Sequence, residues 1–200
     1  MLPIEIEAGV SRLDFMLFRV RTWIGLLLIS CTMGCDSAPP ATATEKVGQP
    51  VAERSAPTLH PLGYLNAAQP KLPTVKVFLG PKEIVAEVAS KPVEIQTGMM
   101  HRTEMGENEG MLFVFGRPMR AAFYMRNTKI PLTCAYIDPE GVVLELHDMK
   151  PLDESSIEAS SDQVQYVLEM RQGWFQKHGI TVGTVVTTER GKLRQTFFRP

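Results

Sequence analysis

The chain has 200 residues, of which 44% are hydrophobic and 22% are charged, and its formal net charge is -1. This length allows one ordinary domain and leaves residues for a segment outside it. A charge so close to zero argues against general nucleic-acid binding, which needs a basic face that displaces counterions from the phosphates. The 3 cysteines are too few for a disulfide-stapled scaffold, and none of them are spaced as the CxxC pairs of structural zinc sites.

Residues 1–35 are predicted to be an export signal. The apolar run 23–29 follows Arg19 and Arg21 and precedes small residues and cysteines. It is much shorter than the roughly 20 residues that a helix needs to cross a bilayer. A basic flank, a short apolar centre and then small residues are typical of a secretory signal peptide. Acidic residues are unusual ahead of such a centre, so Met16 is a candidate for the true start.

Two cysteines near the end of this signal are candidates for lipidation. The run Leu28-Ile29-Ser30-Cys31 resembles the bacterial lipobox, and Cys31 is the predicted lipidation site. Cys35 is the alternative, although no aliphatic residue stands three positions before it. Several acyl chains on one cysteine anchor a protein stably, because each buried methylene contributes about 0.8 kcal/mol. The sequence therefore predicts an exported lipoprotein of the cell envelope, anchored to a membrane and facing the periplasm or the outside; ordinary secretion is the alternative.

Residues 36–73 are predicted to be a disordered linker. They are rich in proline and alanine and show little hydrophobic periodicity. Such a composition cannot bury enough apolar surface to offset the loss of chain entropy. The alternative is a loop that packs on the domain through Leu59, Leu62, Tyr64 and Leu65. A single domain is predicted over 74–190, followed by a C-terminal tail at 191–200.

The first half of the domain alternates short runs of β-forming residues with turn residues. Strands are expected at 74–79 and 83–89, joined as a hairpin at Gly80-Pro81. Ser90 is the expected N-cap of a short helix that has Pro92 in its first turn and ends near Thr97. The run 111–115 is apolar without alternation, which is typical of a strand covered on both faces.

The second half contains the clearest hairpin in the chain. It joins strands at 132–137 and 142–146 through Asp138-Pro139-Glu140-Gly141, in which Asp, Pro and Gly occupy positions that a type I turn favours. A strand at 164–170, a short helix at 173–178 and a last strand at 184–188 follow. These elements favour an all-β or α+β domain over a helical one.

Four runs of residues carry a family resemblance. In chain order they are Gly98-Met99-Met100-His101-Arg102, Gly110-Met111-Leu112-Phe113-Val114-Phe115, Phe123-Tyr124-Met125-Arg126-Asn127-Thr128-Lys129-Ile130-Pro131-Leu132 and Tyr136-Ile137-Asp138-Pro139-Glu140-Gly141. Together they resemble the DUF192 family, a bacterial and archaeal domain of unknown function, over about 74–190. The resemblance implies a mainly β fold, a compact antiparallel β-sandwich or barrel-like domain with one or two short helices. It implies no activity. The chain departs from the family pattern at Thr133 and at Gly183-Thr184, where the family usually has carboxylates.

Three polar residues of these motifs are the candidate ligand-binding residues. Arg102 can offer a planar, bidentate fork to a carboxylate or a phosphate, or it can pair with a glutamate of the segment 104–109. Asn127 can bind the ligand or its own backbone, and Asp138 can bind the ligand or open the hairpin turn. The structural roles are the stronger expectation for all three.

Two further sets of residues could carry chemistry. Glu145 and His147 stand two apart on a predicted strand, so they share a face as an acid–base pair or as part of a solvated surface. Cys134 lies in the middle of a predicted strand, where a buried inert thiol is expected rather than a nucleophile. Because no recognisable catalytic motif occurs in the chain, the sequence leaves open whether the protein is an enzyme.

Copper(I) is the one cofactor that the composition raises, because thioether ligands favour it. The residues concerned are Met99, Met100, His101, Met105, Met111, Met119, Met125 and Met149. Methionine also fills irregular gaps in protein cores, and no regular Met-x-x-Met array occurs. We therefore predict no cofactor and no metal site.

The predicted function is that of an envelope-anchored protein whose domain binds a small ligand or an envelope protein without catalysis. The alternatives are an envelope enzyme that acts on cell-wall or glycan material, with Arg102, Asn127, Glu145 and His147 in its cleft, and a structural or assembly module. An enzyme needs at least one titratable side chain within hydrogen-bond reach of its substrate, whereas a binding module does not.

Overall fold

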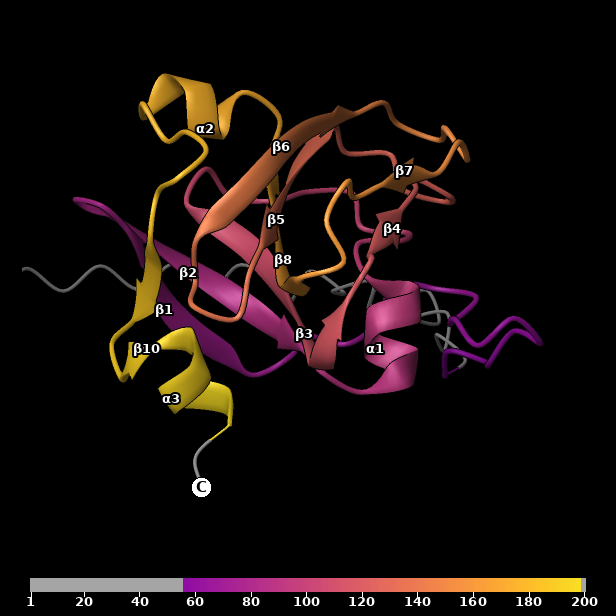
Figure 1. The fold of residues 1–200 in the computed structure, drawn as a ribbon. Coiled ribbons are helices and arrows are strands. Elements are labelled where there is room, and N and C mark those ends of the chain that lie inside the picture. The colour runs from indigo at the N-terminus through magenta and orange to yellow at the C-terminus, as the bar shows by residue number, and fades with distance from the viewer. Residues whose placement is uncertain (1–55, 199–200) are drawn as a thin grey trace, which may run out of the picture. The chain divides into compact units, whose positions relative to one another are not determined.

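The computed structural model describes residues 56–198 (Figure 1). The predicted signal peptide, both candidate lipidation sites and the first part of the predicted linker lie outside this range. No helix within 56–198 is long and apolar enough to span a bilayer.

One large mixed sheet forms most of the domain. Its strands run in the order β10-β9-β1-β2-β3-β8-β5-β6, and a second sheet pairs β4 with β7. The strands are β1 (Thr74–Leu79), β2 (Lys82–Ala89), β3 (Glu109–Met119), β4 (Ala122–Phe123), β5 (Leu132–Ile137), β6 (Val143–Met149), β7 (Ile157–Glu158), β8 (Val164–Arg171), β9 (Val186–Thr188) and β10 (Gly191–Lys192). The prediction of a mainly β fold is confirmed.

The sheet is not wholly antiparallel, because β2 and β3 are parallel. A parallel pair needs a crossover between its strands, and α1 (Pro92–Thr97) lies in this connection. The two other helices of the described part are α2 (Trp174–Lys177) and α3 (Leu193–Phe197). β10 and α3 lie in the predicted tail, where β10 pairs with β9 and Leu193 is fully buried.

Each face of the sheet packs its own apolar core. The first core contains Leu112 of β3 and Leu168 of β8. The second core contains their chain neighbours Phe113 and Val167. Alternate residues of a strand point to opposite faces, so both faces of these two central strands are covered. This confirms the prediction that the run 111–115 is buried on both sides.

The sheet curls until two of its distant strands meet at one corner. A single β-bridge joins Val142 to Val185, and the Val186 N–H donates to the Gly141 carbonyl at 2.7 Å. The predicted hairpin turn leads into this corner, where Asp138 Oδ1 accepts the backbone N–H groups of Glu140 and Val142. The sheet otherwise remains open.

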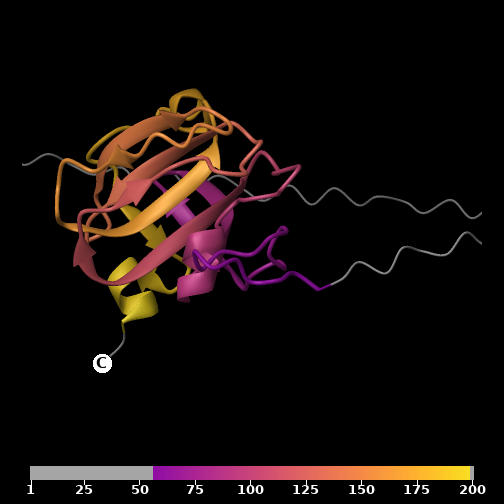
Figure 2. The same ribbon diagram turned by 90° about the vertical axis from the view of Figure 1, so that its right-hand side faces the viewer.

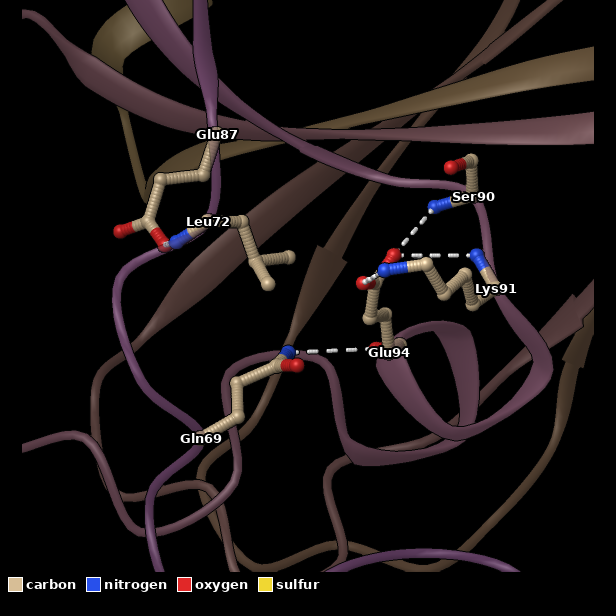
Figure 3. Close-up of polar contacts among 6 residues, drawn as sticks. All are labelled: Gln69, Leu72, Glu87, Ser90, Lys91 and Glu94. Atoms are coloured by element: carbon tan, nitrogen blue, oxygen red, sulfur yellow. Dashed lines mark hydrogen bonds and ion pairs between the residues drawn. The ribbon is translucent and has the colours of Figure 1, made fainter.

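Helix α1 forms where the sequence predicts it, but its start is capped differently. The N-cap residue is Lys91, and the Glu94 carboxylate accepts the backbone N–H groups of Ser90 at 3.1 Å and Lys91 at 3.0 Å (Figure 3). A glutamate at the third helical position can reach back in this way to the N-cap backbone. The Ser90 hydroxyl is therefore not needed as a cap.

The chain that enters the domain packs beside α1 (Figures 1 and 2). Tyr64 and Gln69 are buried, and Gln69 Nε2 donates to the carbonyls of Glu94 at 3.2 Å and Gly98 at 2.9 Å. The predicted linker thus includes residues that dock on the domain, as in the alternative interpretation of this segment. Leu59 and Leu62, by contrast, are exposed.

Candidate functional site

A polar cleft lies between the start of β3, the loop that follows α1 and the entering chain. Its volume is about 680 Å³, and residues from 68 to 110 line it, among them His101, Arg102 and Glu87. The cleft therefore contains Arg102, the first of the candidate ligand-binding residues.

Arg102 pairs with a carboxylate that lies far from it in sequence. Its Nη2 donates to Glu87 Oε2 at 2.9 Å, and the same oxygen accepts the Leu72 backbone N–H at 2.7 Å. Figure 3 shows Glu87 reaching from β2 to Leu72. The predicted alternative partners in the segment 104–109 are not the ones used. Glu87 thus holds the guanidinium and the entering chain in place together.

The pairing leaves part of the guanidinium unused. The Arg102 side chain is only 13% exposed, and its Nε is buried without a hydrogen-bond partner. A buried N–H group that lacks an acceptor costs about 1–3 kcal/mol relative to a paired one. The guanidinium of a residue that lines the cleft therefore keeps one donor for which the described residues supply no acceptor.

His101 presents a second unpaired nitrogen beside Arg102. Its Nε2 is buried without a hydrogen-bond partner, and its backbone is left-handed, with φ 62°. The His101 N–H donates to the Asn127 carbonyl at 2.8 Å, and Asn127 is also left-handed, with φ 54°. Asn127 thus contributes its backbone, which holds the loop that carries His101 and Arg102.

Asp138 lies away from this cleft. Arg102 shares the cleft with Gly110, at the beginning of β3. Gly110 and Thr133 both pair with Met170 of β8, so the cleft lies at the end of the sheet where β5 begins. Asp138 follows Ile137, at the opposite end of β5. The structure therefore joins the Asn127 backbone to the loop that carries Arg102, although Asn127 does not line the cleft, and it places Asp138 in its turn.

Glu145 and His147 share one face of β6, as their spacing predicts. His147 Nε2 lies 2.8 Å from Glu145 Oε2, and Glu145 Oε1 accepts the Ser160 N–H at 2.9 Å. Burial would raise the pKa of Glu145, but the hydrogen bonds from His147 and Ser160 lower it overall. The Glu145 carboxylate is therefore already engaged within the protein, and neither side chain lines the cleft.

A row of side chains crosses the second core and contains a residue that sequence analysis missed. Met111, Glu169, Cys134 and His147 are directly paired across β3, β8, β5 and β6. Glu169 is 4% exposed, its Oε2 has no hydrogen-bond partner, and burial raises its pKa to about 8. Its signal in the sequence is one acidic residue between the apolar Leu168 and Met170 of β8.

The neighbouring thiol is buried, as predicted. Cys134 is completely buried, and burial, followed by the nearby Glu169, raises its pKa to about 12. A thiol with so high a pKa remains protonated near neutral pH and is a poor nucleophile.

The methionines of the copper hypothesis serve largely as core residues. Five of them lie in the second core, namely Met99, Met105, Met111, Met125 and Met149. Within residues 56–198, no group of three His, Cys, Asp or Glu side chains is placed to hold a metal ion.

A carboxylate lies next to Thr133, one of the two positions at which the chain departs from the family pattern. The Thr133 hydroxyl donates to Asp148 Oδ1 at 2.5 Å, and the two residues are paired across β5 and β6. A carboxylate is thus present on the strand next to the position at which the family resemblance implies one.

Comparison with known proteins agrees with the family resemblance. The family model of DUF192, described as an uncharacterized ACR, matches residues 75–188. A solved structure of a protein of unknown function from Novosphingobium aromaticivorans DSM 12444 is 32% identical, with a TM-score of 0.52, over 70% of this chain and 97% of that chain. A structure from Sinorhizobium meliloti 1021, described as a candidate transcription regulator, is 26% identical, with a TM-score of 0.57, over 60% of this chain and 98% of that chain. No curated protein matches the sequence.

Proposed function

The chain belongs to the DUF192 family, as its motifs predict, and we propose that its domain binds a small oxyanion, a carboxylate or a phosphate, without chemical turnover. One observation carries this proposal. Two adjacent residues, His101 and Arg102, line one cleft, and each has a buried nitrogen without a hydrogen-bond partner.

The chemistry of the cleft favours an anionic ligand. The Arg102 Nε–H is a fixed donor, and His101 provides a second donor beside it when its Nε2 carries the ring proton. Hydrogen bonds from charged donors to carboxylate or phosphate oxygens are about twice as strong as neutral ones. Lys71 adds positive charge, whereas Glu104 and Glu109, together with the Glu87 that pairs with Arg102, also line the cleft and disfavour a highly charged anion. A small ligand with one acidic group fits this balance.

The surroundings of His101 support binding without turnover. A general base is usually oriented by a second group, often a carboxylate, that hydrogen-bonds its other ring nitrogen. Glu87 is engaged by Arg102 and by the Leu72 backbone, and His101 Nε2 has no partner. The cleft therefore has the donors of a binding site and lacks an oriented acid–base pair.

Replacing Arg102 with lysine should remove this binding while it retains the charge. We expect acetate or phosphate to raise the Tm of the full chain, since a ligand at 100 times its Kd adds about 2.7 kcal/mol to the free energy of unfolding. The Arg102→Lys variant loses the Nε–H donor and should lose most of this increase. The measurement is a thermal-shift titration in non-ionic detergent, with chloride at equal ionic strength as the reference.

Arg126→Lys is the matched control, because Arg126 pairs with Glu154 outside the cleft. It should leave the anion-dependent increase in Tm unchanged. An equal loss in both variants, or no increase with either anion in the wild-type chain, would refute the oxyanion site.

We also propose that Cys31 carries the lipid that anchors the domain to an envelope membrane. The lipobox-like run before Cys31 supports this proposal, and Cys35 lacks the aliphatic residue of that pattern. In cells fed radiolabelled palmitate, Cys31→Ser should abolish labelling of the chain, whereas Cys35→Ser should leave it intact. Loss of the label only in Cys35→Ser, or no labelling of the wild-type chain, would overturn the assignment.

A further inference from the structure

A second cavity, separate in its chemistry from the polar cleft, lies over the central strands. Its volume is about 190 Å³, and aromatic side chains form much of its wall: Phe113, Phe115, Phe123 and Tyr124. Phe113 and Phe123 meet edge to face, with ring centroids 4.9 Å apart. Met99 lines both this cavity and the cleft, so the loop after α1 separates them.

Glu169 places one carboxyl group in the wall of this aromatic cavity. It comes from β8 and is 4% exposed. Of the four buried side-chain atoms in residues 56–198 without a hydrogen-bond partner, Glu169 Oε2 is the only one whose residue lines the cavity. A buried polar group of this kind is costly to retain. A ligand bound in the cavity would relieve this cost.

No cationic side chain compensates for Glu169 at this site. The residues that line the cavity include no lysine, arginine or histidine. The titratable groups that face Glu169 from the adjacent β5 are Cys134 and Tyr136, and both pKa values are raised, mainly by burial. Tyr136 donates its hydroxyl to the Ile157 carbonyl. The carboxyl group thus has no counterion among the residues that the structure describes.

We propose that this cavity binds a small tertiary or quaternary alkylammonium ion, with Glu169 as its counterion. The faces of aromatic rings attract such cations, most strongly where water is excluded. A primary ammonium has three N–H donors to satisfy, whereas a tertiary ammonium has one and a quaternary ammonium has none. One free carboxyl oxygen among aromatic rings therefore matches the methylated cation. On binding, the neutral carboxyl group releases its proton to solvent and pairs with the cation.

Choline and its uncharged analogue 3,3-dimethylbutan-1-ol test the proposal, because they share a shape and differ in charge. Calorimetric titration of the full chain in non-ionic detergent should show choline binding at least about tenfold more tightly than the analogue. Because binding displaces a proton, the affinity for choline should rise as the pH increases from about 6 to about 8. An affinity for choline that falls over this range, or equal binding of both probes, would overturn the proposal. Either outcome would mean that Glu169 stays protonated and acts as a neutral hydrogen-bond donor rather than as a counterion.

Two variants and one control locate the site. Glu169→Gln should weaken choline binding at least about tenfold and leave binding of the uncharged analogue unchanged. Phe123→Leu, which removes a half-buried ring from the wall, should weaken choline binding more than analogue binding. Glu158→Gln removes an exposed carboxylate from the strand that pairs with β4, and it should have no effect. An effect of Glu158→Gln as large as that of Glu169→Gln would show that only surface charge attracts the cation.

Discussion

Replacing Glu169 with methionine is expected to raise the free energy of unfolding by about 3 kcal/mol at pH 7. Burial raises the pKa of Glu169 from its ordinary value of 4.5 to about 8. At pH 7 the unfolded chain therefore has an ionised carboxylate, whereas the folded chain must keep this group protonated. Methionine removes the cost of that protonation and suits the surrounding core, which already contains several methionines.

The sign of the pH dependence makes this prediction specific. A folded-state pKa above the unfolded value means that the folded chain binds more protons between the two values. The wild-type chain should therefore lose stability relative to Glu169→Met, by about 1.4 kcal/mol per unit from roughly pH 5 to roughly pH 8. Urea unfolding at a series of pH values measures this difference. A constant difference across that range would mean that Glu169 is not protonated in the folded protein.

Gly141→Ala is expected to lower the free energy of unfolding by about 3 kcal/mol. Gly141 has φ +89°, and a Cβ atom there would lie 2.6 Å from the Val186 carbonyl oxygen. That oxygen belongs to the backbone at the corner where the sheet meets itself, so it cannot move without disturbing the contact between Gly141 and Val186. Denaturant unfolding of the full chain measures the loss.

Gly183→Ala is the matched control for this clash. Gly183 has φ +88°, and a Cβ atom there would meet no other atom within 4 Å, so alanine introduces only the backbone strain. We expect a loss of about 1 kcal/mol. Similar losses in the two variants would show that the corner tolerates the added atom and that only the backbone angle matters.

Local features of the sequence were sufficient to predict several elements. The helix at α1 depends on Pro92 in its first turn and Gly98 after its end, and the β5–β6 hairpin depends on the turn residues from Asp138 to Gly141. These signals act within a few residues of one another. The parallel pairing of β2 with β3 is different, since it depends on how the chain returns across α1, and no short pattern encodes that path.

The same distinction explains what was predicted of the candidate site. Arg102 and Asn127 were found through family motifs, and one backbone hydrogen bond from His101 brings their segments together. The partner of Arg102 was not found, because Glu87 is 15 positions away on another element. Glu169 was missed because a single acidic residue in a strand usually faces solvent, and only the pairing of β8 between β3 and β5 buries it.

The most direct test of the oxyanion site is the NMR signal of the Arg102 Nε–H group in the full chain. This donor is buried and has no partner, so an anion that binds in the cleft should shift its proton and nitrogen resonances. We predict a saturable shift for Arg102 on titration with acetate or phosphate, and no comparable shift for Arg126, which is already paired with Glu154. An Arg102 signal that does not move, or that moves no more than that of Arg126, would contradict the proposed function.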